Sequence, residues 1–86
     1  MRHFASRKFW QCFQALPHEV RQLAHCNYDL LKKNPAHPSL QFKLVCSGRF
    51  KSVRVGLHYR APGVPVPEGV QWFWIGSHAE YDQIIG

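Results

Sequence analysis

The chain has 86 residues, of which 11 are Lys or Arg and 5 are Asp or Glu, so its formal net charge is +6 at pH 7. This length suits one domain, and no apolar run approaches the roughly 20 residues of a membrane-spanning helix. The three cysteines lack a C-x-x-C spacing and the six histidines are scattered, so we expect no metal, no cofactor and a reducing, cytoplasmic location. The excess positive charge favours a polyanionic partner, with solubility alone as the alternative explanation.

Two amphipathic helices are predicted in the first third of the chain. Ser6 is a suitable N-cap for a first helix, in which Phe9 and Phe13 belong to an apolar stripe. Pro17 ends this helix and is compatible with the first position of a second one, which runs to about Lys33 and also has one apolar side. We therefore expect a helical hairpin whose apolar face is covered by a sheet.

Four strands are predicted after the helices, over residues 40–45, 50–55, 59–64 and 70–75. Short turn-forming segments separate them, which is typical of an antiparallel meander. The last strand is almost entirely apolar and aromatic, so we expect it to be central and covered on both faces. Ser77 and Glu80 then match the S-x-x-E pattern of a capping box. The fold class predicted is α+β: an N-terminal helical hairpin on a four-stranded, mainly antiparallel sheet, then a short C-terminal helix, in one domain over residues 1–86.

Alternation along the strands places basic side chains on the face of the sheet that the helices leave uncovered. The residues expected to face the helices are Leu40, Phe42, Leu44, Val53, Val55, Tyr59 and Ala61. By the period of two along a strand, Lys43, Arg54 and Arg60 then point to the opposite face, from three neighbouring strands. No carboxylate accompanies them. The pattern favours a functional basic patch over a merely solvated face.

His78 directly follows the last predicted strand and stands at the first position of the C-terminal helix. The strand would fix its position, and the N–H groups of a helix N-terminus favour an anion such as phosphate. An imidazole titrates near neutral pH and can either accept or donate a proton. We therefore interpret His78 as the candidate catalytic residue of a small RNA-cleaving enzyme. The alternative is a histidine that merely occupies a helix N-terminus.

Four segments carry a likeness to a known family: residues 16–20 (LPHEV), 37–40 (HPSL), 52–61 (SVRVGLHYRA) and 74–81 (WIGSHAEY). In this order and spacing they resemble the RelE/ParE superfamily of bacterial toxins from toxin–antitoxin pairs, over about residues 9–85. The resemblance to the RelE branch implies cleavage of messenger RNA, typically in the ribosomal A site and without a metal ion. The ParE branch instead poisons DNA gyrase and lacks a nuclease site, so the family name alone does not decide the activity.

The resemblance also implies roles for individual residues. Arg60 matches the arginine that grips the scissile phosphate, and Arg54 and Lys43 look like the supporting basic residues. His78 stands where some RelE-type members carry arginine and other ribonuclease branches carry histidine. Tyr81 is similar to the aromatic residue of the terminal helix that orients or stacks on the substrate.

Three residues are candidates for substrate binding, namely Lys43, His58 and Lys51. His58 lies in a predicted turn, so a solvated surface histidine is its alternative. The predicted function is a toxin that inhibits translation by metal-free, ribosome-dependent endonucleolytic cleavage of mRNA. Its expected partners are mRNA, the ribosomal A site and a cognate acidic antitoxin. A ParE-like gyrase inhibitor and a non-catalytic basic RNA- or protein-binding module are the alternative functions.

Overall fold

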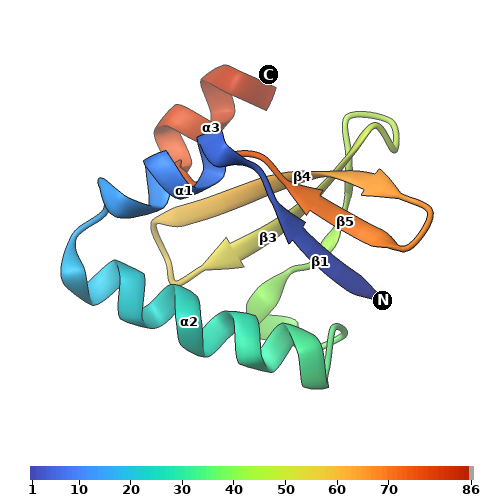
Figure 1. Ribbon diagram of the computed structural model, residues 1–86, viewed down its shortest axis with the longest axis horizontal. Coiled ribbons are helices and arrows are strands. Elements are labelled where there is room, and N and C mark those ends of the chain that lie inside the picture. Colours follow the sequence, from blue (N-terminus) through green and yellow to red (C-terminus); the bar gives the residue numbers. More distant parts are fainter. Residues whose placement is uncertain (86) are drawn as a thin grey trace.

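The computed structural model describes residues 1–85, so Gly86, the last residue of the predicted domain, lies outside the described residues. The helices and strands follow in the order β1 (Arg2–Ala5), α1 (Arg7–Gln14), α2 (His18–Lys33), the short 3-10 helix η1 (Pro38–Leu40), β2 (Lys43–Val45), β3 (Phe50–Val55), β4 (Tyr59–Val66), β5 (Gly69–Trp72), β6 (Gly76–Ser77) and α3 (His78–Ile85). Figure 1 shows how α1, α2, α3, β1, β3, β4 and β5 are arranged. No helix within residues 1–85 is both long enough and apolar enough to cross a membrane.

The described strands form one six-stranded mixed sheet, so the prediction of four strands is corrected. The order along the sheet is β1-β5-β4-β3-β2, and β6 pairs with β4. The β2–β3, β3–β4 and β4–β5 pairs are antiparallel, as predicted, whereas β1 lies parallel to β5. Strand β1 is only four residues long, too short for a periodic pattern, and it depends on hydrogen bonds to a segment far along the chain.

The predicted strand over residues 70–75 is wrong beyond Trp72, because residues 73–75 are not in a strand. Strand β5 ends at Trp72, and after a three-residue connection the chain pairs with β4 as β6, where Gly76 lies opposite Arg60. Strand β5 is flanked by β1 and β4, but it is not covered on both faces: Val70 and Trp72 are buried and Gln71 is exposed. Gly76 itself belongs to the sheet, because it pairs with Arg60 of β4. A side chain at this position would collide with the indole of Trp74, which explains the glycine.

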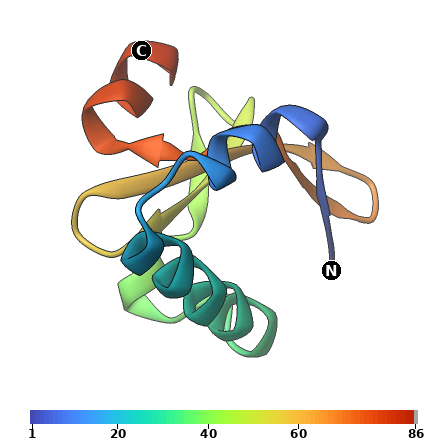
Figure 2. The ribbon, with the colours of Figure 1, turned by 60° about the vertical axis from the view of Figure 1, so that its left-hand side comes forward.

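The two N-terminal helices form where the sequence indicates. The Ser6 side chain accepts a hydrogen bond from the Phe9 N–H at 3.2 Å and so caps α1. Pro17 is the N-cap of α2 and not its first helical residue. Figure 2 shows α2 and α3 on opposite sides of the sheet.

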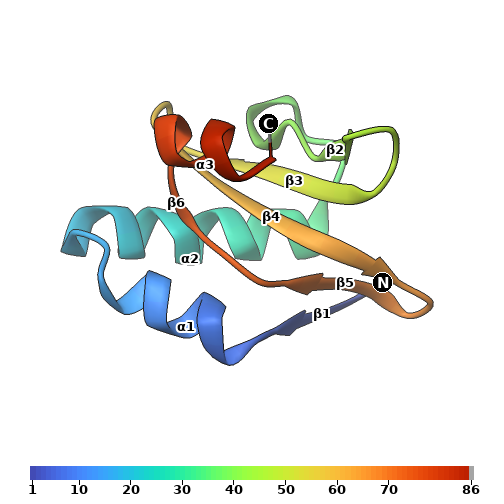
Figure 3. The same ribbon diagram turned by 90° about the horizontal axis from the view of Figure 1, so that it is seen from above.

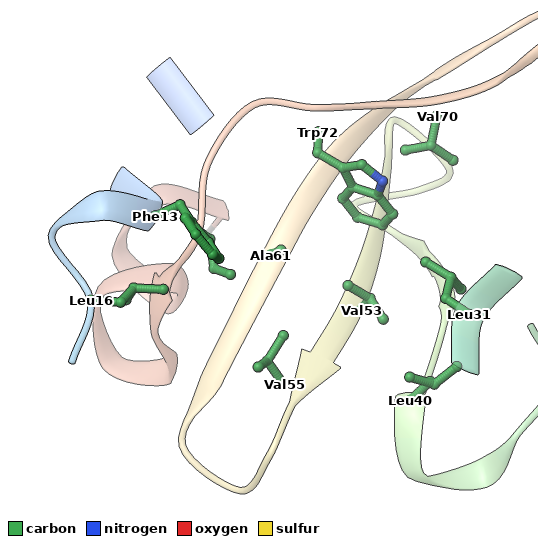
Figure 4. Close-up of a cluster of buried hydrophobic side chains, with 10 residues drawn as sticks. Phe13, Leu16, Leu31, Leu40, Val53, Val55, Ala61, Val70 and Trp72 are labelled. Atoms are coloured by element: carbon green, nitrogen blue, oxygen red, sulfur yellow. The ribbon is translucent and has the colours of Figure 1, made fainter. Parts of the chain in front are cut away.

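The apolar core lies between the N-terminal helices and one face of the sheet. Figure 4 shows its buried side chains, namely Phe13, Leu16, Leu31, Leu40, Val53, Val55, Ala61, Val70 and Trp72. The predicted facing of Val53, Val55 and Ala61 is therefore confirmed. Leu44 was expected to face the helices but is 54% exposed, because β2 is a three-residue edge strand. Leu40 enters the core from η1 and not from a strand.

Candidate active site

Strands β3 and β4 bring two arginines into register. Arg54 lies directly opposite Arg60 in the antiparallel ladder, so both side chains leave the same face of the sheet, opposite to the core residue Val53. The Nε of Arg54 donates a hydrogen bond to the Gly56 carbonyl at 2.9 Å, which directs its guanidinium toward the β3–β4 turn. Like charges that face each other across strands repel. The hydrogen bond to Gly56 holds the two cations in different directions.

Arg60 lies at the centre of this face and is only 7% exposed. Its Nη1 donates to the Ser52 hydroxyl at 3.0 Å, and its Nη2 donates to the Gln41 side-chain carbonyl at 2.8 Å. Its Cζ lies 5.6 Å from the centroid of the Tyr81 ring. All three partners are neutral, and within residues 1–85 no carboxylate forms an ion pair with Arg60 or Arg54. A buried guanidinium surrounded by neutral groups attracts an anion.

Gln41 and Ser52 are site residues to which the sequence analysis assigned no role. The contact of Gln41 with Arg60 depends on the backbone. Gln41 ends η1 in the left-handed region, with φ 45 and ψ 44. A residue other than glycine rarely adopts this conformation. The left-handed conformation of Gln41 carries its side-chain amide to the Arg60 guanidinium. No local sequence signal reveals this conformation.

The face that carries Arg60 is not uncovered, which corrects the prediction of an open basic face. Helix α3 packs over β4, Tyr81 is 6% exposed, and Ser52 is fully buried. Figure 3 shows α3 beside β4, and Figure 2 shows it on the side of the sheet opposite α2. The prediction missed this layer because the sequence reveals the length of α3 but not the surface on which it packs.

His78 reaches this face through β6. The Tyr59 and Ser77 positions pair in the ladder, and the His78 N–H donates to the His58 carbonyl at 2.7 Å. The Ser77 hydroxyl accepts from the Glu80 N–H at 3.2 Å and donates to the Glu80 carboxylate at 2.9 Å. The N-cap role of Ser77 is therefore confirmed, while the Glu80 carboxylate accepts from the hydroxyl and not from the backbone.

Tyr81 contacts both candidate catalytic residues. The ring centroids of His78 and Tyr81 are 6.0 Å apart, and the Cζ of Arg60 lies 5.6 Å from the centroid of the same Tyr81 ring. The His78 side chain is 49% exposed, so its imidazole is open to solvent. The structure thus brings His78, Tyr81 and Arg60 together, with Tyr81 as the shared neighbour.

The predicted substrate-binding residues divide between the two faces. Lys43 of β2 lies opposite Ser52, is exposed, and shares the face of Arg60. His58 is exposed in the β3–β4 turn beside His78. Lys51 precedes Ser52 on β3 and therefore leaves the opposite face, where its Nζ lies 4.9 Å from the centroid of the Phe42 ring. Lys51 is not part of the cluster around Arg60.

A second feature lies on the helical side of the sheet. A cavity of about 310 Å³ is lined mainly by apolar and aromatic residues of β1, α1, α2 and the sheet, among them Phe9, Trp10, Tyr28 and Trp72. His3 also lines it and accepts a hydrogen bond at Nδ1 from Trp72 Nε1 at 3.2 Å. Burial lowers the pKa of His3 below its ordinary value, with further contributions from the N-terminal ammonium and Lys32.

No group of three or more His, Cys, Asp or Glu side chains in the described chain is arranged to hold a metal ion. The candidate site consists of a buried guanidinium, two further cations on the same face, a buried aromatic ring and an exposed imidazole. This set can bind a phosphate, stabilise negative charge that develops on it and transfer a proton.

In comparisons of sequence, neither a family model nor a curated protein matches this chain. Solved structures do match. A chain of the RelB–RelE antitoxin–toxin complex from Methanococcus jannaschii has a TM-score of 0.72 at 12% identity, covering 96% of this chain and 99% of that one. The isolated E. coli RelE toxin has a TM-score of 0.65 at 12% identity, covering 95% and 93%. A chain of the archaeal RelE–RelB complex from Pyrococcus horikoshii has a TM-score of 0.62 at 19% identity, covering 88% of this chain and 92% of that one. These matches confirm that the chain has the fold of the RelE toxins.

Proposed function

We propose that this chain, which has the fold of the RelE toxins, is the toxin of a toxin–antitoxin pair and inhibits translation by cleaving messenger RNA. The observation that carries this proposal is the buried Arg60 guanidinium, whose partners within residues 1–85 are all neutral. A phosphate would supply the missing negative charge. Tyr81, which lies against Arg60, also contacts His78, and the imidazole of His78 is suited to proton transfer.

Cleavage of RNA without a metal ion proceeds by attack of a 2′-oxygen on the adjacent phosphorus. The new O2′–P bond forms, the P–O5′ bond breaks, and the products carry a 2′,3′-cyclic phosphate and a 5′-hydroxyl. The 2′-OH loses a proton and the leaving 5′-oxygen gains one. His78 is the residue proposed to take part in this transfer, which contributes roughly 10²–10⁴ in rate in typical enzymes.

Arg60 is proposed to stabilise the negative charge that develops on the phosphate oxygens. Ser52 and Gln41 hold its guanidinium in place before the substrate arrives, so little reorganisation is needed during the reaction. Their two hydrogen bonds leave other N–H groups of the guanidinium for an anion. Arg54 and Lys43, on the same face, add positive charge along the path of the RNA backbone.

A cognate acidic antitoxin is the proposed protein partner, alongside mRNA and the ribosomal A site in the cytoplasm. The solved neighbours from Methanococcus jannaschii and Pyrococcus horikoshii are complexes of RelE with RelB. The net charge of +6 suits an acidic partner. The cavity beside α1 and α2 offers an apolar surface, and Trp10 at this cavity is 48% exposed.

Cleavage of a defined mRNA in a purified translation system tests the proposal. We expect R60A and H78A to abolish cuts in the ribosomal A site, whereas R49A, which removes an exposed arginine from the β2–β3 turn, leaves them unchanged. Because Arg60 is buried, circular dichroism of R60A and R60K must show that each variant folds. Intact mRNA with the wild-type protein would contradict the proposal. Inhibition of gyrase supercoiling would then establish a ParE-like activity, and RNA binding without cleavage a binding module.

A further inference from the structure

A carboxylate lies against the imidazole of His78. The Oδ2 of Asp82 is 3.2 Å from the Nδ1 of His78, and the two residues are one helical turn apart on α3. Their side chains are 62% and 49% exposed, respectively. Glu80, the other acidic residue of this helix, bonds to the Ser77 hydroxyl instead. Asp82 is thus the acidic side chain of α3 that contacts His78.

This contact selects one form of the neutral imidazole. A neutral imidazole carries one N–H, and an ionised carboxylate can only accept a hydrogen bond. With an ionised carboxylate 3.2 Å from Nδ1, the tautomer that carries its proton on Nδ1 is favoured, and Nε2 then presents a lone pair. The same contact restricts the rotation of the ring, because it holds Nδ1 close to the carboxylate.

We propose that Asp82 is a positioning residue for His78, which holds the Nδ1–H tautomer so that Nε2 is the atom that exchanges a proton with the RNA. The inference rests on the proposed function, whose residues it extends. Nε2 either takes the proton of the attacking 2′-OH or, once protonated, returns one to the leaving 5′-oxygen. In both directions the proton on Nδ1 stays with the imidazole, and the Asp82 carboxylate does not take it up.

The exposure of the pair determines when the contact matters most. A solvent-exposed ion pair contributes little in water, because water screens it and both side chains lose freedom. Bound RNA would exclude water from α3 and lower the local dielectric constant, which strengthens the interaction. The contact already biases the tautomer of the free protein and affects the rate most in the substrate complex, so its loss should reduce kcat more than it raises KM.

Two measurements on the full chain test this role. The first needs no RNA: ¹⁵N NMR of the histidine ring nitrogens at about pH 8, where an imidazole is mostly neutral, reports the tautomer of His78. We expect Nδ1–H in the wild type and in D82E, and a shift toward Nε2–H in D82A. D29N removes another exposed helical carboxylate, which pairs with Lys32, and should leave the tautomer of His78 unchanged.

The second measurement is RNA cleavage. We expect D82A to lower kcat about tenfold with KM changed by less than about twofold, and D82E to restore most of the rate. An unchanged tautomer in D82A, or a full kcat, would overturn the inference. If the wild type cuts no RNA, the proposed function fails, while the NMR experiment still decides whether Asp82 holds the imidazole.

Discussion

The guanidinium carbon of Arg60 lies 5.6 Å from the ring centroid of Tyr81, and this contact joins the C-terminal helix to the middle of the sheet. It places a cation from β4 and an aromatic ring from α3 in one buried layer. Because the same ring contacts His78, the position of α3 determines both halves of the proposed site. The stability of α3 and the geometry of the site are therefore coupled.

Removal of the Tyr81 ring should detach α3 from the sheet. We expect Y81A to lower the free energy of unfolding by about 3–5 kcal/mol, the usual cost of deleting a buried aromatic ring. Y81F keeps the ring over Arg60 and should cost much less. Urea unfolding followed by circular dichroism measures both, and equal stability of Y81A and the wild type would show that α3 does not depend on this contact.

Replacement of Gln41 should separate stability from activity. Q41A leaves Nη2 of Arg60 without its acceptor and should cost about 1–3 kcal/mol of stability. Q41E puts a carboxylate beside the buried guanidinium, so we expect a protein at least as stable as the wild type.

The carboxylate of Q41E would also compete with phosphate for the Arg60 guanidinium. We expect about tenfold weaker RNA binding, as measured by fluorescence anisotropy with a labelled oligonucleotide. L44E provides a control, because it adds a carboxylate at an exposed position of β2. An affinity for Q41E equal to that of the wild type would indicate that RNA does not bind at Arg60.

Stability should fall in mild acid because of His3. Its pKa is lowered in the folded protein from the ordinary 6.5, first by burial and then by the N-terminal ammonium and Lys32. The unfolded chain therefore binds this proton more readily than the folded one. The contribution to stability is complete above about pH 6.5 and is lost as the pH falls through the lower, folded-state pKa.

The variant H3Q isolates this term, because glutamine does not titrate and can still accept a hydrogen bond from Trp72. Protonation of Nδ1 removes the acceptor of the Trp72 N–H, so the effect should be about 1 kcal/mol, the usual net value of one hydrogen bond. Thermal unfolding across the acid range should therefore show a smaller decrease for H3Q than for the wild type. Parallel curves for the two proteins would contradict the role of His3.

Gly76 should tolerate no side chain while Trp74 is present. A methyl group at this position would overlap the indole, so we expect G76A to destabilise the protein by about 1–3 kcal/mol and to disturb β6. In a W74A background the same substitution should cost clearly less. A double-mutant cycle of unfolding free energies measures this coupling, and additive effects would place the constraint elsewhere.

Sequence patterns were sufficient for the elements whose signals are local. The N-cap at Ser6 and the inward facing of Val53 and Val55 follow from short-range rules, namely side-chain capping and the period of two along a strand. The same alternation predicted that Arg54 and Arg60 share a face, which the ladder between β3 and β4 confirms.

The helices, the central antiparallel strands and the shared face of the two arginines could be predicted from sequence, because each depends on residues close together in the chain. The pairing of β1 with β5, the burial of Arg60 beneath Tyr81 and the contact of Gln41 with the guanidinium became visible only in the three-dimensional structure. Each of these joins segments separated by many residues. Long-range packing selects such contacts, and no periodicity within one segment encodes them.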